Sequence, residues 1–302
     1  MQEFKNLLFA GIVHPFTKWV LIAVSVLLII SVFLLIAFQF QPEFSDSASF
    51  NELIKDFNLT DFLLFMLVGF LAQMIDGALG MAYGISSTTF LLSLGLPPAS
   101  ASASVHAAEV VTTGASGLSH LKFKNVNKKL FRSLVIPGVI GAIIGAFLLS
   151  SIDGNIIKPY IAAYLFLMGW VVIFKALFNK AKKRKTKHIA SLAFAGGLLD
   201  TTGGGGWGAV VVSGLLYNGR NPRYTIGSVN LAEFFVALAG ASTFTFMLGI
   251  DNWIVVTGLM CGGVIASPFA AYLCQKVNNR TLMLIVGVVI ILLSLRTIML
   301  SF

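Results

Sequence analysis

Long uncharged apolar runs constrain this chain more than any other feature of its sequence. Residues 20–38 contain no charged side chain, and comparable apolar runs follow along the rest of the chain. About 20 apolar residues of helix cross the hydrocarbon core of a bilayer. Only 11% of the residues are charged and 57% are hydrophobic, whereas roughly a quarter are charged in soluble domains. The sequence predicts an all-α polytopic membrane protein without a separate soluble domain.

Basic residues gather in short loops between the apolar runs, and this explains the net charge of +9 without nucleic acid. The loops at 122–132 and 179–188 hold most of them, as cytoplasmic loops of membrane proteins do. The run at 20–38 is longer than the ~7–15-residue core of a signal peptide, and no clear cleavage site follows it. We expect residues 1–60 to form a retained transmembrane helix and an extracytoplasmic loop.

The second half of the chain repeats the first at an offset of 124 positions. Four of the 12 acids are expected inside apolar segments, and they form two pairs related by that offset. The coincident residues are Asp76 with Asp200, Gly80 with Gly204, Gly84 with Gly208, Pro98 with Pro222, Ser104 with Ser228, and Glu109 with Glu233. Internal repeats are typical of secondary transporters. The sequence predicts one repeat at 61–178, a basic loop at 179–188 and a second repeat at 189–302.

Loop charge predicts that the two repeats have opposite orientations. The acidic stretch 41–61 is expected outside and the basic loops inside. Residues 62–96 then start and finish outside, and as one helix they would measure about 52 Å, too long for a single span. By the same reasoning 189–217 starts and finishes inside. The prediction is seven crossings and two re-entrant hairpins, with the N-terminus inside and the C-terminus outside. A rival topology, in which each interrupted stretch is one broken crossing, stays open.

Glycine-rich interruptions inside these two stretches are the candidate binding site. Broken helix is tolerated at membrane depth only where it lines a cavity or is buried in protein, and restarting helices aim free N–H groups and positive dipole ends at that place. Packing of small residues between helices is the alternative. The candidate binding residues are Gly80, Met81, Ala82, Tyr83, Gly84, Thr201, Thr202, Gly203, Gly204, Gly205, Gly206, Trp207 and Gly208. Ser86, Ser87 and Thr88 add hydroxyl groups.

A second group of candidates consists of polar side chains within the expected helices. His106 and Glu109 share one helix face at i, i+3, and Asn230 and Glu233 occupy the same positions in the second half. Intramembrane ionisable groups are costly and usually functional. A proton relay and a structural hydrogen-bonded pair both remain open for them. Asp76 and Asp200 directly precede the interruptions, where capping of exposed N–H groups is preferred over substrate contact.

The sign of a transported ion does not follow from these residues. Buried acids, with no Lys or Arg deep in any expected span, favour a cation or proton, whereas backbone dipoles favour an anion. No H-E-x-x-H motif and no nucleophile with an identifiable base are present in the sequence. We therefore expect no cofactor, no resident metal and no enzymatic activity.

The interruptions resemble those of the TauE/SafE sulfite exporter family. The run from Asp200 to Gly208 matches the family's glycine-rich turn, and Gly80 to Gly84 is a degenerate version of it. Pro97-Pro98 and the segment 136–141 also fit, so the resemblance covers about 60–300. It implies a cell-membrane transporter, with export the direction by analogy, for a sulfur oxyanion such as sulfite or an organosulfonate. The expected partners are this small anion and membrane lipid, and a homodimer is left open.

Overall fold

A computed structural model describes residues 58–79, 81–122, 124–177, 188–218, 220–249, 252–273 and 279–301. The predicted N-terminal helix at 20–38 lies outside these residues. So do Gly80, the acidic stretch up to residue 57 and the basic stretch 178–187. The topological predictions made for those segments stay predictions.

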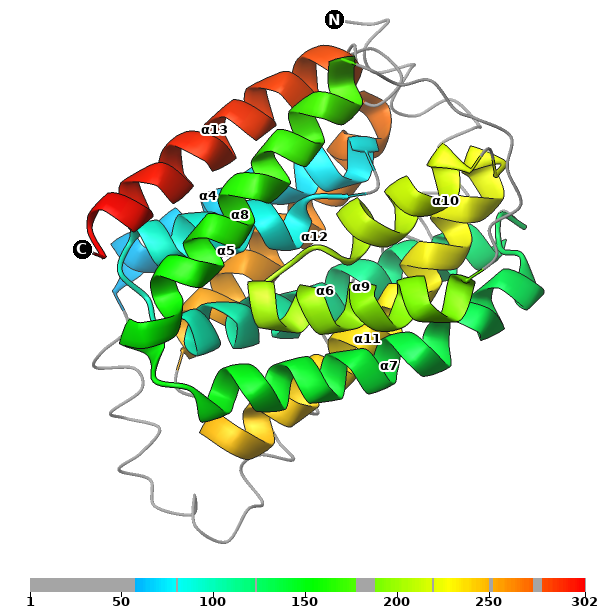
Figure 1. Ribbon diagram of the computed structural model, residues 1–302. Coiled ribbons are helices and arrows are strands. Elements are labelled where there is room, and N and C mark those ends of the chain that lie inside the picture. Colours follow the sequence, from blue (N-terminus) through cyan, green and yellow to red (C-terminus); the bar gives the residue numbers. More distant parts are fainter. Residues whose placement is uncertain are drawn as a thin grey trace, which may run out of the picture. The chain divides into compact units, whose positions relative to one another are not determined.

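The described residues fold into helices and contain no strand (Figure 1). In chain order the elements are α4 Leu59–Leu79, α5 Tyr83–Ser93, α6 Pro98–Lys122, α7 Lys128–Ser151, α8 Gly154–Leu177, α9 Ile189–Gly203, the π-helical turn η2 Gly208–Val212, α10 Ser213–Tyr217, α11 Pro222–Leu248, α12 Trp253–Leu273 and α13 Asn279–Met299.

Asparagine caps set where two of the long helices begin. The Asn127 side chain accepts hydrogen bonds from the backbone N–H groups of Lys129 and Leu130, which starts α7. Asn221 accepts from the N–H of Arg223 and precedes a proline in the first turn of α11. Both arrangements satisfy amides that lack a partner within their own helix.

The element boundaries follow the 124-residue offset. Helix α6 begins at Pro98 and α11 at Pro222, while α8 begins at Gly154 and α13 at Asn279, one residue from its expected match. The packing follows the same correspondence, because α4 lies along α12 while α9, its match in the second half, lies along α7. Glycines allow these close approaches. A Cβ on Gly262 would overlap the backbone of Met66, and a Cβ on Gly197 would overlap the carbonyl of Gly138.

Helices α9 and α10 start and finish at the same end of the described helices. Ile189 and Arg220 line one recess together with Asn127 and Lys129. Between these ends the two segments run antiparallel, since a Cβ on Gly214 would lie 3.0 Å from the Leu192 side chain. We call this the α7 end, after the helix that begins there.

Helices α4 and α5 start and finish at the opposite end. Helix α11 runs away from the α7 end, so α12, which follows it, begins at the opposite end. Helix α4 runs parallel to α12, with Phe65 beside Gly258, and so begins at that end as well. At the end of α5, the Ser93 carbonyl accepts a hydrogen bond of 2.8 Å from Arg296, near the end of α13. The two interrupted segments thus enter the helical bundle from opposite ends (Figure 1).

The outer surface suits a lipid environment. Within the described ranges, three helices are long and apolar enough to cross a membrane: Lys128–Ser151, Gly154–Leu177 and Arg223–Leu248. Large apolar side chains on them are exposed, among them Ile136 at 65% and Phe246 at 88%. Such exposure is costly in water and ordinary in lipid. The chain is a multi-pass α-helical membrane protein.

Candidate functional site

Both predicted interruptions are breaks in helix with left-handed backbone. Ala82, which precedes α5, has a φ of 91°. In the second half Gly204, Gly205 and Gly206 have φ values of 70°, 143° and 149°. Glycine adopts such angles without a steric penalty, so the second break follows directly from its glycines, whereas the first holds an alanine in a conformation that alanine rarely adopts.

The two breaks touch each other at a buried place. A Cβ on Gly84 would lie 2.7 Å from the Cα of Gly205, and a Cβ on Gly205 would overlap the backbone of Gly84 and Ile85. The Thr88 hydroxyl on α5 donates to the carbonyl of Gly204. Residues that lie far apart in the sequence are therefore brought together, backbone against backbone.

Asp200 ties the second break to the helix that restarts after it. Its Oδ1 accepts the backbone N–H of Trp207 at 2.8 Å, and its carbonyl oxygen accepts the N–H of Gly205 at 2.7 Å. The residue is 1% exposed. In the first half, the Asp76 carboxylate takes the corresponding backbone hydrogen bond from Tyr83. Each acid thus accepts a backbone N–H at the point where a helix restarts after the break.

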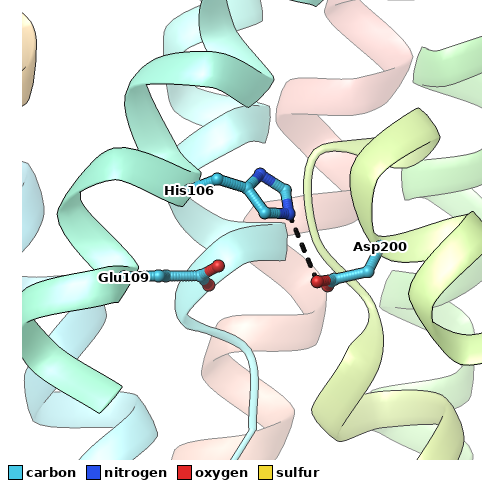
Figure 2. Close-up of side chains that lie close together, drawn as sticks. All are labelled: His106, Glu109 and Asp200. Carbon is cyan, nitrogen blue, oxygen red and sulfur yellow. Dashed lines mark hydrogen bonds and ion pairs between the residues drawn. The ribbon is translucent and has the colours of Figure 1, made fainter. Parts of the chain in front are cut away.

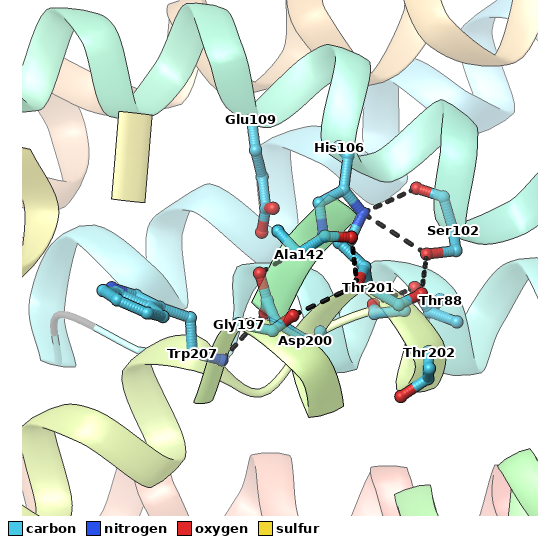
Figure 3. Close-up of polar contacts among 12 residues, drawn as sticks. Thr88, Ser102, His106, Glu109, Ala142, Gly197, Asp200, Thr201, Thr202 and Trp207 are labelled. Atoms are coloured by element: carbon cyan, nitrogen blue, oxygen red, sulfur yellow. Dashed lines mark hydrogen bonds and ion pairs between the residues drawn. The ribbon is translucent and has the colours of Figure 1, made fainter. Parts of the chain in front are cut away.

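His106 bridges α6 and the second break (Figures 2 and 3). Its Nε2 lies 3.2 Å from Asp200 Oδ2, and its Nδ1 lies 2.8 Å from the Ser102 carbonyl. A carbonyl only accepts, so Nδ1 carries a hydrogen. The contact between Nε2 and the Asp200 carboxylate ties the fully buried ring to the second break as well as to α6.

Glu109 reaches the first break from the same helix face as His106. Its carboxylate accepts a backbone hydrogen bond from Gly84, and its Oε2 is buried without a hydrogen-bond partner among the described residues. Ligand atoms of His106, Glu109 and Asp200 lie within 4.8 Å of one another (Figure 2). Buried acceptors are nearly always hydrogen-bonded, so this oxygen is an available acceptor next to the first break.

Other predicted residues support the breaks from outside. Thr201 donates to the Ala142 carbonyl at 3.0 Å and accepts at its own carbonyl from Ser102, while Thr202 donates within its own helix to Leu198. The Trp207 indole is fully buried and donates to the Val229 carbonyl at 3.3 Å. The side chains of Thr201 and Trp207 thus join neighbouring helices.

The remaining candidates lie around the cluster of His106, Glu109 and Asp200. Asn230 donates to Ser116 at 3.0 Å, and Glu233 lies half-buried on α11. Met81 is buried, and Gly203 and Gly206 lie against the ring of Tyr164. Gly208 opens η2 and is buried. Glu109 therefore accepts a hydrogen bond at the first break, whereas Glu233 acts electrostatically on Glu109, Asp76 and Asp200.

Two side chains near the breaks have no place among the sequence predictions. The Tyr164 hydroxyl on α8 donates to the Gly205 carbonyl at 3.1 Å. Lys175, in the last turn of α8, places its Nζ 2.9 Å from both Met81 Sδ and Ser213 Oγ. A lysine near the end of a span is expected to extend to the membrane surface, so its sequence position gave no signal that it turns inward.

Replacing Asp200 by alanine is expected to destabilise the protein by about 3–5 kcal/mol. The change leaves a buried imidazole and the Trp207 amide without their acceptor, and breaking a buried pair costs roughly this much. The asparagine side chain of the D200N variant still offers an oxygen to Trp207 and an amide to His106, so this variant should cost far less. Thermal unfolding in detergent compares the two variants, and equal midpoints would contradict the capping role.

Comparison with known proteins places this arrangement in a family. The family described as "Sulfite exporter TauE/SafE" matches residues 65–297. A Bacillus subtilis (strain 168) protein named "Probable membrane transporter protein YtnM" is 46% identical over 245 residues, 78% of this chain and 82% of that protein. A second protein of that strain, "Probable membrane transporter protein YunE", is 21% identical over 77% of this chain and 96% of its own length. No solved structure matches the chain. With its apolar helices and paired breaks, the chain is a membrane transporter that belongs to the TauE/SafE sulfite exporter family.

Proposed function

We propose that this transporter carries a small sulfur oxyanion, such as sulfite or an organosulfonate, by alternating access. The observation that carries the proposal is the contact between the breaks at Gly84 and Gly205, one from each half of the chain. Substrate sites in secondary transporters lie where interrupted helices of two repeats meet. The family description supplies the class of substrate.

Two inverted repeats account for the observed helix directions. Helices α4 and α5 enter from one end of the bundle and α9 and α10 from the other, and the boundaries of the remaining helices follow the same offset. Such repeats exchange two conformations when one half rocks against the other. In the present structure the breaks touch, so an anion binds between them when the halves move apart.

The amides at the breaks are the proposed anion ligands. The N–H groups of Tyr83, Gly84 and Trp207 now bond the carboxylates of Asp76, Glu109 and Asp200. A carboxylate and a small oxyanion make the same type of hydrogen bond to an amide, so each acid occupies a position that a substrate would use. Helix N-termini favour negative charge at these positions.

Glu109 is the acid that we expect the substrate to displace. Asp200 has a partner on both oxygens, whereas one Glu109 oxygen has none among the described residues. When Glu109 binds a proton, its negative charge no longer competes with the oxyanion for the Gly84 amide. Proton and anion would then bind together, and this supports proton coupling through Glu109.

We place the α7 end in the cytoplasm. Lys128, Lys129 and Arg132 lie at this end, and cytoplasmic loops carry an excess of Lys and Arg. The cell membrane is the proposed location and export the proposed direction.

Sulfite flux into proteoliposomes tests the function. We expect flux that saturates with sulfite concentration and that is accelerated by sulfite trapped on the opposite side. Protein-dependent flux that rises linearly, without counterflow, would contradict a carrier, and no flux above empty vesicles would contradict sulfite as a substrate. An organosulfonate measured in the same vesicles identifies the preferred anion.

A metal-ion transporter is the second candidate, because His106, Glu109 and Asp200 bring ligand atoms within 4.8 Å. Against it, both Asp200 oxygens already have hydrogen-bond partners, as has His106 Nδ1. Binding of a divalent cation such as Zn²⁺ to purified protein, measured with and without sulfite, separates the two. Tight metal binding that is lost in E109Q would favour the metal, and sulfite binding unaffected by metal would favour the anion.

A further inference from the structure

Lys175 reaches into the bundle from the last turn of α8. Its ammonium nitrogen lies 2.9 Å from the sulfur of Met81 and 2.9 Å from the hydroxyl oxygen of Ser213. Met81 belongs to the first break and is 4% exposed, and Ser213 begins α10. The ammonium group therefore lies between the first break and the segment that returns from the second.

The partners of this ammonium group leave its charge unbalanced. A thioether sulfur is a weak acceptor and a hydroxyl is neutral, while an ammonium has three N–H donors. Among the described residues, no carboxylate forms an ion pair with Lys175. The ion pair within these residues joins His106 and Asp200. Partly buried charges without a counterion are costly, and within membrane segments they mark ion pathways.

No cation stands at the corresponding position of the other half of the chain. At the 124-residue offset, Lys175 corresponds to Met299 and Ser213 to Thr89. The end of α8 lies at the α7 end of the bundle, because α7 runs from that end and α8 returns to it. The last turn of α13 also holds a cation, Arg296, but it is exposed and donates to the Ser93 carbonyl, so the two halves differ in where their cation lies.

We propose that Lys175 and Ser213 form a capture site for a small sulfur oxyanion that arrives from the α7 end. The ammonium supplies the charge, and the Ser213 hydroxyl, which accepts from Lys175, keeps its own hydrogen to donate to an anion oxygen. The proposal rests on the proposed function and specifies the end of the bundle at which the anion is first bound. Anions are bound more tightly from the α7 end than from the opposite end, where apolar Met299 takes the equivalent position.

Transport measured in oriented membrane vesicles tests at which end of the bundle the anion is captured. Replacing Lys175 by glutamine should raise the half-saturating sulfite concentration about tenfold when sulfite is added at the α7 end, since a charge-assisted hydrogen bond contributes roughly this factor. Sulfite added at the opposite end should show less than about a twofold change. K175R, which keeps the charge, should resemble the parent protein. Lys158→Gln, at the other end of α8, is the matched control and should leave both values unchanged.

An equal effect of Lys175→Gln on both sides, or none, would overturn the capture site while leaving the transport function intact. A second measurement does not depend on transport. Methanesulfonate should slow acetylation of Lys175, measured by mass spectrometry, whereas chloride at the same ionic strength should not, and Lys129 should react equally in both. Equal reaction of Lys175 in methanesulfonate and chloride would refute the site even in a protein that carries no sulfite.

Discussion

Replacing Gly205 by alanine will reduce sulfite transport at least tenfold. The added Cβ overlaps the backbone of Gly84 and Ile85, and backbone, unlike a side chain, has no alternative rotamer to adopt. Overpacking costs about 1–3 kcal/mol, and a left-handed conformation adds roughly 1–2 kcal/mol for a residue with a Cβ. Gly205 has a φ of 143°. The measurement is the initial rate of uptake at equal amounts of reconstituted protein.

Gly95 provides the matched control for Gly205. It also has a positive φ, 99°, but a Cβ there would have no heavy atom within 4 Å. Gly95→Ala therefore adds backbone strain without a collision, and we expect it to retain most of the transport rate. Similar rates for G205A and G95A would show that contact between the breaks is unnecessary for transport.

Glu109→Gln is expected to abolish the response of transport to an imposed pH gradient. The glutamine oxygen still accepts from the Gly84 amide, but the side chain no longer binds and releases a proton. The pH at which Glu109 binds a proton also depends on the ionisable groups that interact with it electrostatically. These are His106, Asp200, Asp76, Tyr83 and Glu233. Uptake is compared with and without the gradient in the parent and the variant.

Asp61→Asn is the control for loss of an acid. Asp61 lies exposed at the start of α4, away from the breaks, so the variant should respond to pH as the parent does. A parental pH response in E109Q would remove Glu109 from the coupling mechanism and leave it a structural role at Gly84. A lost response in Asp61→Asn would show that surface charge, not Glu109, determines the effect.

Helix positions could be predicted from the sequence because the membrane imposes a minimum apolar length and the repeat offset checks each assignment. The predicted interrupted stretch 189–217 spans α9, η2 and α10, from Ile189 to Tyr217. The break at 204–206 was equally predictable, since three consecutive glycines tolerate the observed φ values.

Partners across helices could not be predicted in the same way. Spacing placed His106 and Glu109 on one face of α6, but it carried no information on which residue of another helix would lie opposite, and that residue for His106 is Asp200. Lys175 illustrates the same limit, because its direction depends on how α8 packs beside Met81 and Ser213. Such contacts follow from tertiary packing and not from local pattern.

A density map of the protein with bound sulfite tests the central claim most directly. The account predicts density for the anion between the two breaks, within hydrogen-bond distance of the Gly84 amide, with the Glu109 carboxylate moved away from that amide. Sulfite bound elsewhere, with Gly84 and Gly205 still in contact, would contradict it.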